Sequence, residues 1–470
     1  PVNLYLCVLL LYAGVLLAIG VWSGRRVGTT SDFFVAGRRL GPGLIFATLL
    51  AINIGAGSTV GAAGLGYRDG LSASWWVGSA GIGSIALAFW IGPRFRQLAA
   101  AHNLRTVGDF LEHRYGREAR ATITILLWVG TLFILAAQLM AMGFVLGAVS
   151  GLDRWIGSLI GGIVVTVYFT AGGLLTSVVV NTVQLVVLLT GFVVIFPMIL
   201  TSVGGFPQLL ADTREIEGYW NIWQGGGSGW FYLATLGPSF ICSPGIVQRV
   251  YAASDDRAVK LGVGLNGLAL LICAAAPALL GMMARTVVPD LTDQTLNFAL
   301  PTLLIETLPP LLGALGLAAI FSAEISSADA ILFMLATSLS RDLYGRFINP
   351  DASDARVLQV ARGAAVAGGT AGTILSIAFN SIVSALTFFY TLLTVSLFVP
   401  LVVGLYVRRI RTSEALASTV AGTAVAGFLQ LTTDGNGLAG MTPSMLGLGA
   451  ALTAAVIAGV ITRNRPVEMS

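Results

Sequence analysis

The chain has 470 residues, enough for about three soluble domains of ordinary size. Its composition excludes that organisation, because 56% of the residues are hydrophobic and only 10% are charged, against about 25% charged in a typical soluble protein. So few charges cannot cover a water-facing surface, and the sequence therefore predicts an integral membrane protein in contact with lipid. The net charge of +4 comes from basic loops that we expect to anchor the protein at the membrane rather than to bind nucleic acid.

Long uncharged runs lie between the bunched charges. A helix that spans the hydrocarbon core needs about 20 apolar residues, and continuous apolar runs are typical of helices rather than of barrel strands, which alternate. The runs predict an all-α protein with about thirteen transmembrane helices. The expected spans are 3–22, 43–64, 72–92, 119–148, 155–170, 174–202, 229–248, 261–284, 309–340, 358–379, 383–406, 415–432 and 443–462.

The basic residues divide unequally between the two sides of this arrangement. When alternate loops are assigned to alternate sides, 22 of the 26 lysine and arginine residues fall on one side. Because basic loops tend to stay in the cytoplasm, this side is predicted to be cytoplasmic. The N-terminus is then outside and the C-terminus inside, as an odd number of spans requires, and we expect a multi-pass protein of the plasma membrane.

Two expected spans contain residues that weaken a helix at mid-membrane. The second span has residues 53–59 (NIGAGST) at its centre, and each glycine costs a helix about 1 kcal/mol relative to alanine. The seventh contains residues 243–245 (SPG), where proline removes a backbone hydrogen bond. Each interruption lies in the first of five consecutive spans, and such a pair indicates an inverted-repeat transporter with its site at the midplane. The alternative is that these residues only permit close packing or kinks.

Several segments resemble the sodium/solute symporter family, which includes sodium-coupled proline, galactose and sialic acid transporters. They occur in the family's order and on the matching spans, and the resemblance covers most of the chain. The segments are Phe34–Arg38, the set Gly61, Gly64, Tyr67 and Gly70, then Thr106–Gly116, Tyr168–Gln184, Ile325–Asp329 and Arg341–Tyr344. We expect the charged pair Arg341 and Asp342 to end the eighth core helix at the surface.

The resemblance implies a fold of the leucine-transporter type. Ten core helices would form two inverted five-helix repeats, with one extra helix before the core and two after it. The expected division is 1–40 for the extra helix and its loop, 41–202 for the first repeat, 203–228 for an outer loop, 229–406 for the second repeat and 407–470 for two further helices and a short tail.

The resemblance also implies a sodium ion bound between the first and eighth core helices. Its ligands would be the backbone carbonyls of Ala51, Ile54 and Ala323 and the side chains of Ser326 and Ser327. On a helix Ala323 lies three and four residues before the two serines, so all three share one face. The alternative is that the serines bond back to the preceding turn of their own helix, as they commonly do.

The sequence departs from the family at Asn181. Many members carry an aspartate at this position of the fifth core helix, and in some it helps to bind a second sodium ion. Asparagine keeps an oxygen but loses the charge. We therefore expect one sodium ion per transported solute.

A solute is expected beside both interruptions, in contact with Ser58, Thr59 and Ser243. Trp76 and Val77 match positions that line the pocket of the family's sugar transporter. That transporter has polar or charged groups at the positions of Ser58 and Val77, which argues against a sugar here. A small, weakly polar pocket suits a small organic solute such as an amino or carboxylic acid, and helix N-terminal amides could bind an anion.

Glu324 and Asp329 are the acids expected inside a span, and both flank the sodium-site serines. An unpaired charge at this depth costs several kcal/mol, so each must be paired, hydrated or protonated. For Asp329 the family suggests a structural hydrogen-bonding role. For Glu324 we expect negative potential that favours the cation, with proton coupling as the alternative.

Two other classes of function remain open besides sodium-coupled symport of a small organic solute. One is a proton-coupled transporter of the same fold, which would use Glu324 and Asp329. The other is a membrane sensor that binds solute without net uptake. No catalytic constellation supports an enzyme, and the sequence predicts no oligomeric state.

Overall fold

The computed structural model describes residues 3–24, 40–223, 229–407, 410–433 and 435–463, without the side chains of residues 17, 19–24, 171–190 and 463. The described part is helical apart from turns, loops and two isolated β-bridges. Its α-helices are α1 (Leu4–Gly24), α3 (Pro42–Asn53), α4 (Ala62–Asp69), α5 (Ser74–Ala86), α6 (Gly92–His102), α7 (Val107–Tyr115), α8 (Arg117–Ser150), α9 (Arg154–Ser202), α10 (Gly205–Thr213), α11 (Tyr232–Cys242), α12 (Pro244–Tyr251), α13 (Asp256–Cys273), α14 (Ala275–Val287), α15 (Ala299–Thr307), α16 (Pro310–Thr337), α17 (Asp354–Ala378), α18 (Ile382–Phe398), α19 (Gly404–Tyr406), α20 (Thr412–Thr432) and α21 (Pro443–Arg463). Shorter 3₁₀ and π-helical segments are η1 (Gly57–Gly61), η2 (Gly70–Ala73), η3 (Leu87–Ile91), η4 (Leu296–Phe298), η5 (Ser338–Ile348) and η6 (Val399–Val403).

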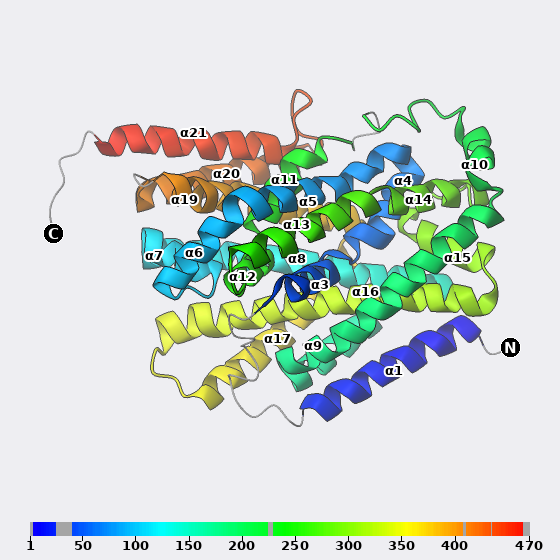
Figure 1. Ribbon diagram of the computed structural model, residues 1–470, viewed down its shortest axis with the longest axis horizontal. Coiled ribbons are helices and arrows are strands. Elements are labelled where there is room, and N and C mark those ends of the chain that lie inside the picture. The colour runs from blue at the N-terminus through cyan, green and yellow to red at the C-terminus, as the bar shows by residue number, and fades with distance from the viewer. Residues whose placement is uncertain (1–2, 25–39, 224–228, 408–409, 434, 464–470) are drawn as a thin grey trace.

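The long helices run broadly along the long axis of the molecule (Figure 1). The helices α8 and α16 form its centre, because 83% of the most apolar stretch of each is buried, against 11% for Pro443–Thr462 in α21. In Figure 1 α1 and α21 lie at opposite edges of the bundle. The first residue of α1 and the last residue of α21 lie at opposite ends, as an odd number of crossings requires.

Within the described residues, eight helices are long and apolar enough to cross a membrane. Two shorter apolar helices, Pro42–Asn53 and Tyr232–Cys242, end where the sequence predicts the interruptions. Each is about 17–18 Å long, roughly half the hydrocarbon thickness, so it reaches only to mid-membrane. The all-helical membrane architecture and both interruptions are confirmed, whereas the thirteen spans and the inverted repeat stay predictions.

One helix differs from expectation. The expected spans 155–170 and 174–202 form a single helical segment, α9, of 49 residues. Glycines 172 and 173, which lie between the two expected spans, do not end the helix, because glycine weakens a helix without forbidding it. After α9 the chain bends by 63°, between Gly191–Ser202 and Gly205–Thr213.

An ion network joins α7 and the start of α8 to η5, the segment that follows α16. Arg120 of α8, which is 6% exposed, lies 2.7 Å from Glu112 and 3.1 Å from Asp109 of α7. Its other terminal nitrogen lies 2.5 Å from Asp342 in η5. Arg346 of η5 also pairs with Glu112. The helix α7 starts with a capping box formed by Thr106 and Asp109, which fixes its first turn beside this network.

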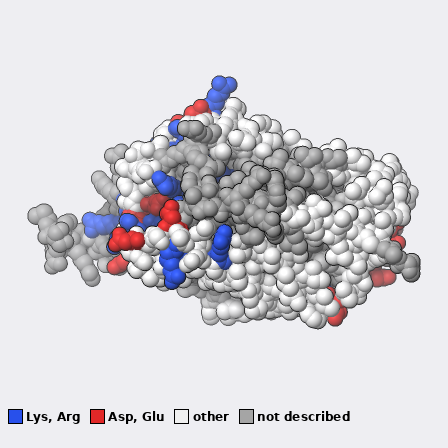
Figure 2. All heavy atoms as spheres, turned by 90° about the horizontal axis from the view of Figure 1, so that it is seen from below, with Lys and Arg blue, Asp and Glu red and all other residues white. Residues whose placement is uncertain are grey.

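The expectation that Asp342 would be a surface charge is wrong, because its side chain is only 10% exposed. The helix does not end there but continues as η5 to Ile348, which places Asp342 against Arg120. Figure 2 shows basic and acidic side chains gathered toward one end of the molecule, while the visible charges at the other end are acidic.

Candidate substrate and ion site

The first interruption begins where α3 ends at Asn53. Ile54 is extended (φ −97°, ψ 105°), and helical structure resumes in η1 at Gly57. The Ser58 hydroxyl donates to the Asn53 carbonyl at 3.1 Å and accepts the Gly55 N–H at 3.0 Å. Ser58 therefore offers the backbone local hydrogen bonds that compete with the helix. The Ser58 hydroxyl was expected to contact a solute, but in the structure it forms hydrogen bonds with the backbone of the interruption itself.

Side chains from two neighbouring helices hold the unwound backbone. Ser327 of α16 donates a hydrogen bond to the Ile54 carbonyl oxygen at 3.1 Å. Gln138 of α8 accepts a hydrogen bond from the Ala56 N–H at 2.8 Å. A Cβ on Gly55 would lie 2.4 Å from the Ser327 hydroxyl oxygen, so this close approach requires glycine. Gln138 was not among the residues expected from the sequence, since one glutamine in a long uncharged run does not reveal its partner.

The structure brings two of the five expected sodium ligands into contact, Ile54 and Ser327. Oxygens 3.1 Å apart are close enough to share one cation. Ala51 lies on α3, and Ala323 and Ser326 lie on α16; these three residues are buried on the same pair of packed helices. The expected ligands are carbonyls freed by the unwound turn and serine hydroxyls. These are the hard oxygen ligands that a sodium ion requires, so the residues fit the ion.

The two acids of α16 are fully buried and have different surroundings. The Thr59 hydroxyl lies 2.8 Å from one carboxylate oxygen of Glu324. The other oxygen of Glu324 has no hydrogen-bond partner in the described part of the chain. Asp329 accepts a hydrogen bond from the Tyr168 hydroxyl at 3.2 Å, and the structural role expected for it stays a prediction. Asn181 lies within α9, and its side chain is outside the described residues.

The second interruption is a single residue, Ser243, between α11 and α12. Its ψ of 122° takes it out of the helical region, and its carbonyl accepts the Val247 N–H at 2.9 Å. Pro244 occupies the first position of α12, where its missing N–H costs nothing and its fixed φ favours the helix. Ser243 is half-buried.

Trp76 connects the first interruption to two other core helices. A Cβ on Gly57 would lie 3.1 Å from the Trp76 ring nitrogen, so the indole borders the unwound segment. The ring packs edge-on against Tyr232 of α11 at 4.9 Å and Tyr390 of α18 at 6.1 Å between centroids. Val77 is buried on the same helix, α5. The two tyrosines were missed, because an aromatic residue within an apolar span looks like any other core residue.

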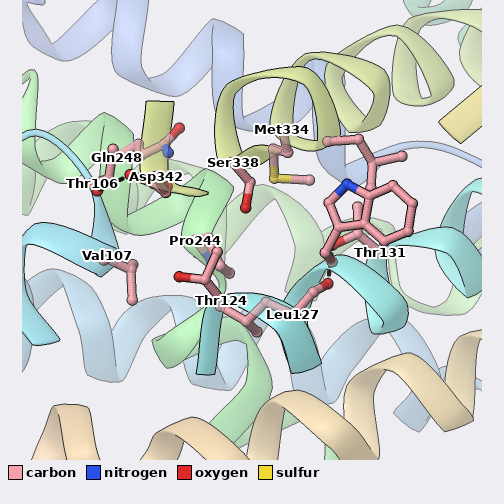
Figure 3. A pocket seen from close by; sticks show the side chains of 13 residues that line it. Thr106, Val107, Thr124, Leu127, Thr131, Pro244, Gln248, Met334, Ser338 and Asp342 are labelled. Atoms are coloured by element: carbon pink, nitrogen blue, oxygen red, sulfur yellow. Dashed lines mark hydrogen bonds between the residues drawn. The ribbon is translucent and has the colours of Figure 1, made fainter. Parts of the chain in front are cut away.

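A cavity extends from the second interruption toward the ion network (Figure 3). It has about 480 Å³ of space between atoms, part of it open to solvent. Figure 3 shows Gln248, Thr106 and Asp342 at one side of it and Met334 and Ser338 nearer its middle. None of the expected solute-contacting residues lies among its described lining, although Pro244 directly follows Ser243. The lining residues are Thr106, Val107, Gly108, Thr124, Leu127, Trp128, Thr131, Pro244, Gln248, Met334, Leu335, Ser338 and Asp342.

A bundle of apolar helices in which short helices break off at interruptions is typical of membrane transporters. A family model described as "Sodium:solute symporter family" matches residues 33–422. The chain belongs to this family, and the resemblance found in the sequence is confirmed.

Characterised relatives are transporters of small solutes. The chain is 29% identical over 446 residues to the sodium/pantothenate symporter of Escherichia coli, with 88% of each protein covered. It is 24% identical to the high-affinity proline transporter PutP of Bacillus subtilis, over 87% of this chain and 88% of that protein. Identity to the human sodium/iodide cotransporter is 26%, over 69% of this chain but only 53% of the longer relative.

Solved structures show the same fold. A Na⁺-coupled sialic acid symporter in a substrate-bound, outward-open state matches with a TM-score of 0.78 at 18% identity and covers 97% of this chain and 98% of that one. The structure of MhsT in complex with L-phenylalanine matches with a TM-score of 0.52 at 13% identity, over 88% of this chain and 98% of that one. These likenesses concern the fold alone.

Proposed function

We propose that the protein is a secondary active transporter that couples the entry of sodium to the uptake of a small organic solute by alternating access. The observation that supports this most strongly is the contact between the Ser327 hydroxyl and the Ile54 carbonyl at the unwound turn. Sodium would bind there, held by Ala51, Ile54, Ala323, Ser326 and Ser327. The binding of the ion would stabilise the packing of α3 against α16.

The solute site lies beside the two interruptions in this proposal. Thr59 and Trp76 border the first one, and Ser243 forms the second. Ser58 contributes through the shape of the turn, because its hydroxyl already bonds the backbone. Val77 adds apolar surface. A small amino or carboxylic acid fits these groups best, and the pantothenate and proline transporters among the relatives carry small carboxylates.

One sodium ion per solute is proposed, on the ground that Asn181 replaces the charged residue of many family members. A neutral amide is a weaker cation ligand than a carboxylate. A sodium-to-solute ratio of two, measured from reversal potentials in proteoliposomes, would contradict this stoichiometry.

The proposed topology places the N-terminus outside the plasma membrane and the C-terminus in the cytoplasm. The opposite ends of α1 and α21 in Figure 1 and the gathering of basic side chains in Figure 2 support it. The cavity of Figure 3, which reaches the ion network, would then face the cytoplasm. The count of thirteen spans and two inverted repeats belongs to this proposal.

The decisive experiment is a counterflow screen in proteoliposomes with a panel of small amino and carboxylic acids. Accumulation of one solute with an inward sodium gradient, and its loss when potassium replaces sodium, is expected. A solute that binds without any net uptake would instead indicate a sensor.

Proton coupling through Glu324 is the second candidate, favoured by its full burial and by the oxygen that lacks a partner in the described part. We prefer an electrostatic role, in which the carboxylate near the unwound turn favours a cation. Glu324→Gln should then weaken sodium binding while sodium-driven uptake persists. Uptake that runs on a proton gradient without sodium, and that the Gln variant abolishes, would establish the second candidate.

A further inference from the structure

Gln138 contacts the unwound turn from a helix that carries none of the expected sodium ligands. It lies near the middle of α8 and is 3% exposed. Its side-chain oxygen accepts a hydrogen bond from the backbone N–H of Ala56 at 2.8 Å, across 82 positions of sequence. A backbone N–H can only donate, so the amide oxygen must be the atom in contact.

This contact lies beside the proposed sodium ligands. If Gly55 carried a Cβ, that atom would lie 2.7 Å from the Gln138 oxygen and 2.4 Å from the Ser327 oxygen. Both oxygens therefore converge on one point above the Gly55 backbone. Ile54 is the residue immediately before Gly55, and its carbonyl accepts a hydrogen bond from the Ser327 hydroxyl.

The unwound turn needs such a partner, because water is scarce at mid-membrane and an unsatisfied N–H costs free energy there. In a continuous helix the Ala56 N–H would bond a carbonyl four residues earlier, and Ile52 would supply it. Gln138 accepts the hydrogen bond of the same N–H where the helix is interrupted. It therefore stabilises the unwound arrangement, in which the Ile54 carbonyl is free to face a cation.

We infer that Gln138 is a positioning residue for the sodium ion: its hydrogen bond to Ala56 holds the Ile54 carbonyl in place opposite Ser327. This rests on the proposed sodium site and adds to it a residue of α8. Apparent affinity falls in proportion to the fraction of molecules in the binding-competent arrangement. Loss of the hydrogen bond should therefore weaken sodium binding without removing any ligand.

The test uses sodium alone as the probe. Thermal unfolding of the purified protein is followed while sodium replaces potassium at constant ionic strength. Gln138→Met keeps the length of the side chain but removes the acceptor, and it should raise the half-saturating sodium concentration about tenfold, the size expected for one hydrogen bond.

Met142→Leu is the matched control, since Met142 is a buried α8 residue that packs against Gly161 of α9. It should leave the half-saturating sodium concentration unchanged even if it lowers the unfolding temperature. If Gln138→Met does not fold, Gln138→Asn, whose amide is one carbon shorter, must show the rise.

An unchanged sodium midpoint in the variant that removes or shortens the acceptor, in a protein whose wild type responds to sodium, would overturn the inference and leave the proposed function intact. A wild type that sodium does not stabilise would refute the sodium site and this inference together.

Discussion

The Ser327 hydroxyl donates a hydrogen bond to the Ile54 carbonyl at 3.1 Å, although the two residues are 273 positions apart. The Ile54 carbonyl is available because α3 ends at Asn53 and Ile54 itself lies outside the helical region. A carbonyl within a continuous helix would be occupied by the N–H four residues later. The contact therefore depends on the unwound turn, and it joins the end of α3 to α16 at the sodium site that we propose.

Replacing the serines tests this contact directly. Ser327→Ala removes one of five proposed ligands without changing the charge, so the half-saturating sodium concentration should rise about tenfold, which corresponds to about 1.4 kcal/mol. Ser326→Ala should act in the same direction. Sodium titration of thermal unfolding measures both. Ser322→Ala is the control, because the Ser322 hydroxyl on the same helix bonds Tyr12 instead. A sodium response equal to wild type in the Ser326/Ser327 double variant would refute the site.

Gly55 gives a second test, based on space rather than on ligands. In Gly55→Ala the new methyl group would lie 2.4 Å from the Ser327 oxygen and 2.7 Å from the Gln138 oxygen, so both side chains must move. We expect sodium-dependent stabilisation to be lost. Gly363→Ala in α17 has open space around the added methyl and should leave the sodium response unchanged, with stability altered by less than about 1 kcal/mol. Retained sodium stabilisation in Gly55→Ala would show that the turn can rearrange freely.

The membrane architecture and both interruptions could be predicted from the sequence, because lipid imposes a simple rule. Apolar runs of sufficient length become helices, and residues such as Gly55 and Pro244 weaken those helices locally whatever surrounds them. The length of a helix beyond such residues is less predictable. Helix α9 runs through two glycines, and η5 extends the eighth core helix past Asp342. Both outcomes depend on tertiary packing.

The candidate site could be predicted only where the family supplied a pattern. Ser327 and Ile54 were expected, and their contact is observed. Gln138 and Tyr390 were not expected, because their roles arise from helices distant in sequence. Arg120, at the start of the expected span 119–148, was not singled out in the sequence. It is buried because α7 folds back against the start of α8 and brings two acids to it.

Ser243 provides a test of the solute site. Ser243→Phe should fill the second interruption with an aromatic ring and abolish binding of the transported solute, whereas Ser243→Ala should weaken it only slightly. The measurement is stabilisation of each variant by the solute that the counterflow screen identifies, at saturating sodium. If the solute stabilises the Phe variant as well as it does the wild type, the binding site lies elsewhere.

Arg120 should be important for stability, because it lies buried between α7 and η5. Its side chain is 7% exposed and that of Asp342 is 10% exposed. Removing one partner of a buried ion pair leaves an uncompensated charge, which typically costs about 3–5 kcal/mol. Arg120→Met should therefore lower the unfolding temperature strongly. Arg117→Met should have little effect, since Arg117 is 63% exposed and lies 3.7 Å from Glu112. Similar unfolding temperatures for the two variants would show that the network contributes little.

Glu112 should make the stability of the same network depend on pH. The hydrogen bond from Arg346, assisted by Arg120, lowers the pKa of Glu112 below its ordinary value of 4.5, although partial burial opposes the shift. The folded state therefore binds a proton at this site less readily than the unfolded state does. The stabilisation is fully present above pH 4.5 and is lost as the pH falls through the lower, folded-state pKa. Thermal unfolding measured from pH 7 down to about pH 3 should show a smaller decline below pH 4.5 for Glu112→Gln than for the wild type. Glu118→Gln, at an exposed position of α8, should decline as the wild type does. Equal declines in the wild type and in Glu112→Gln would mean that other carboxylates determine the acid sensitivity.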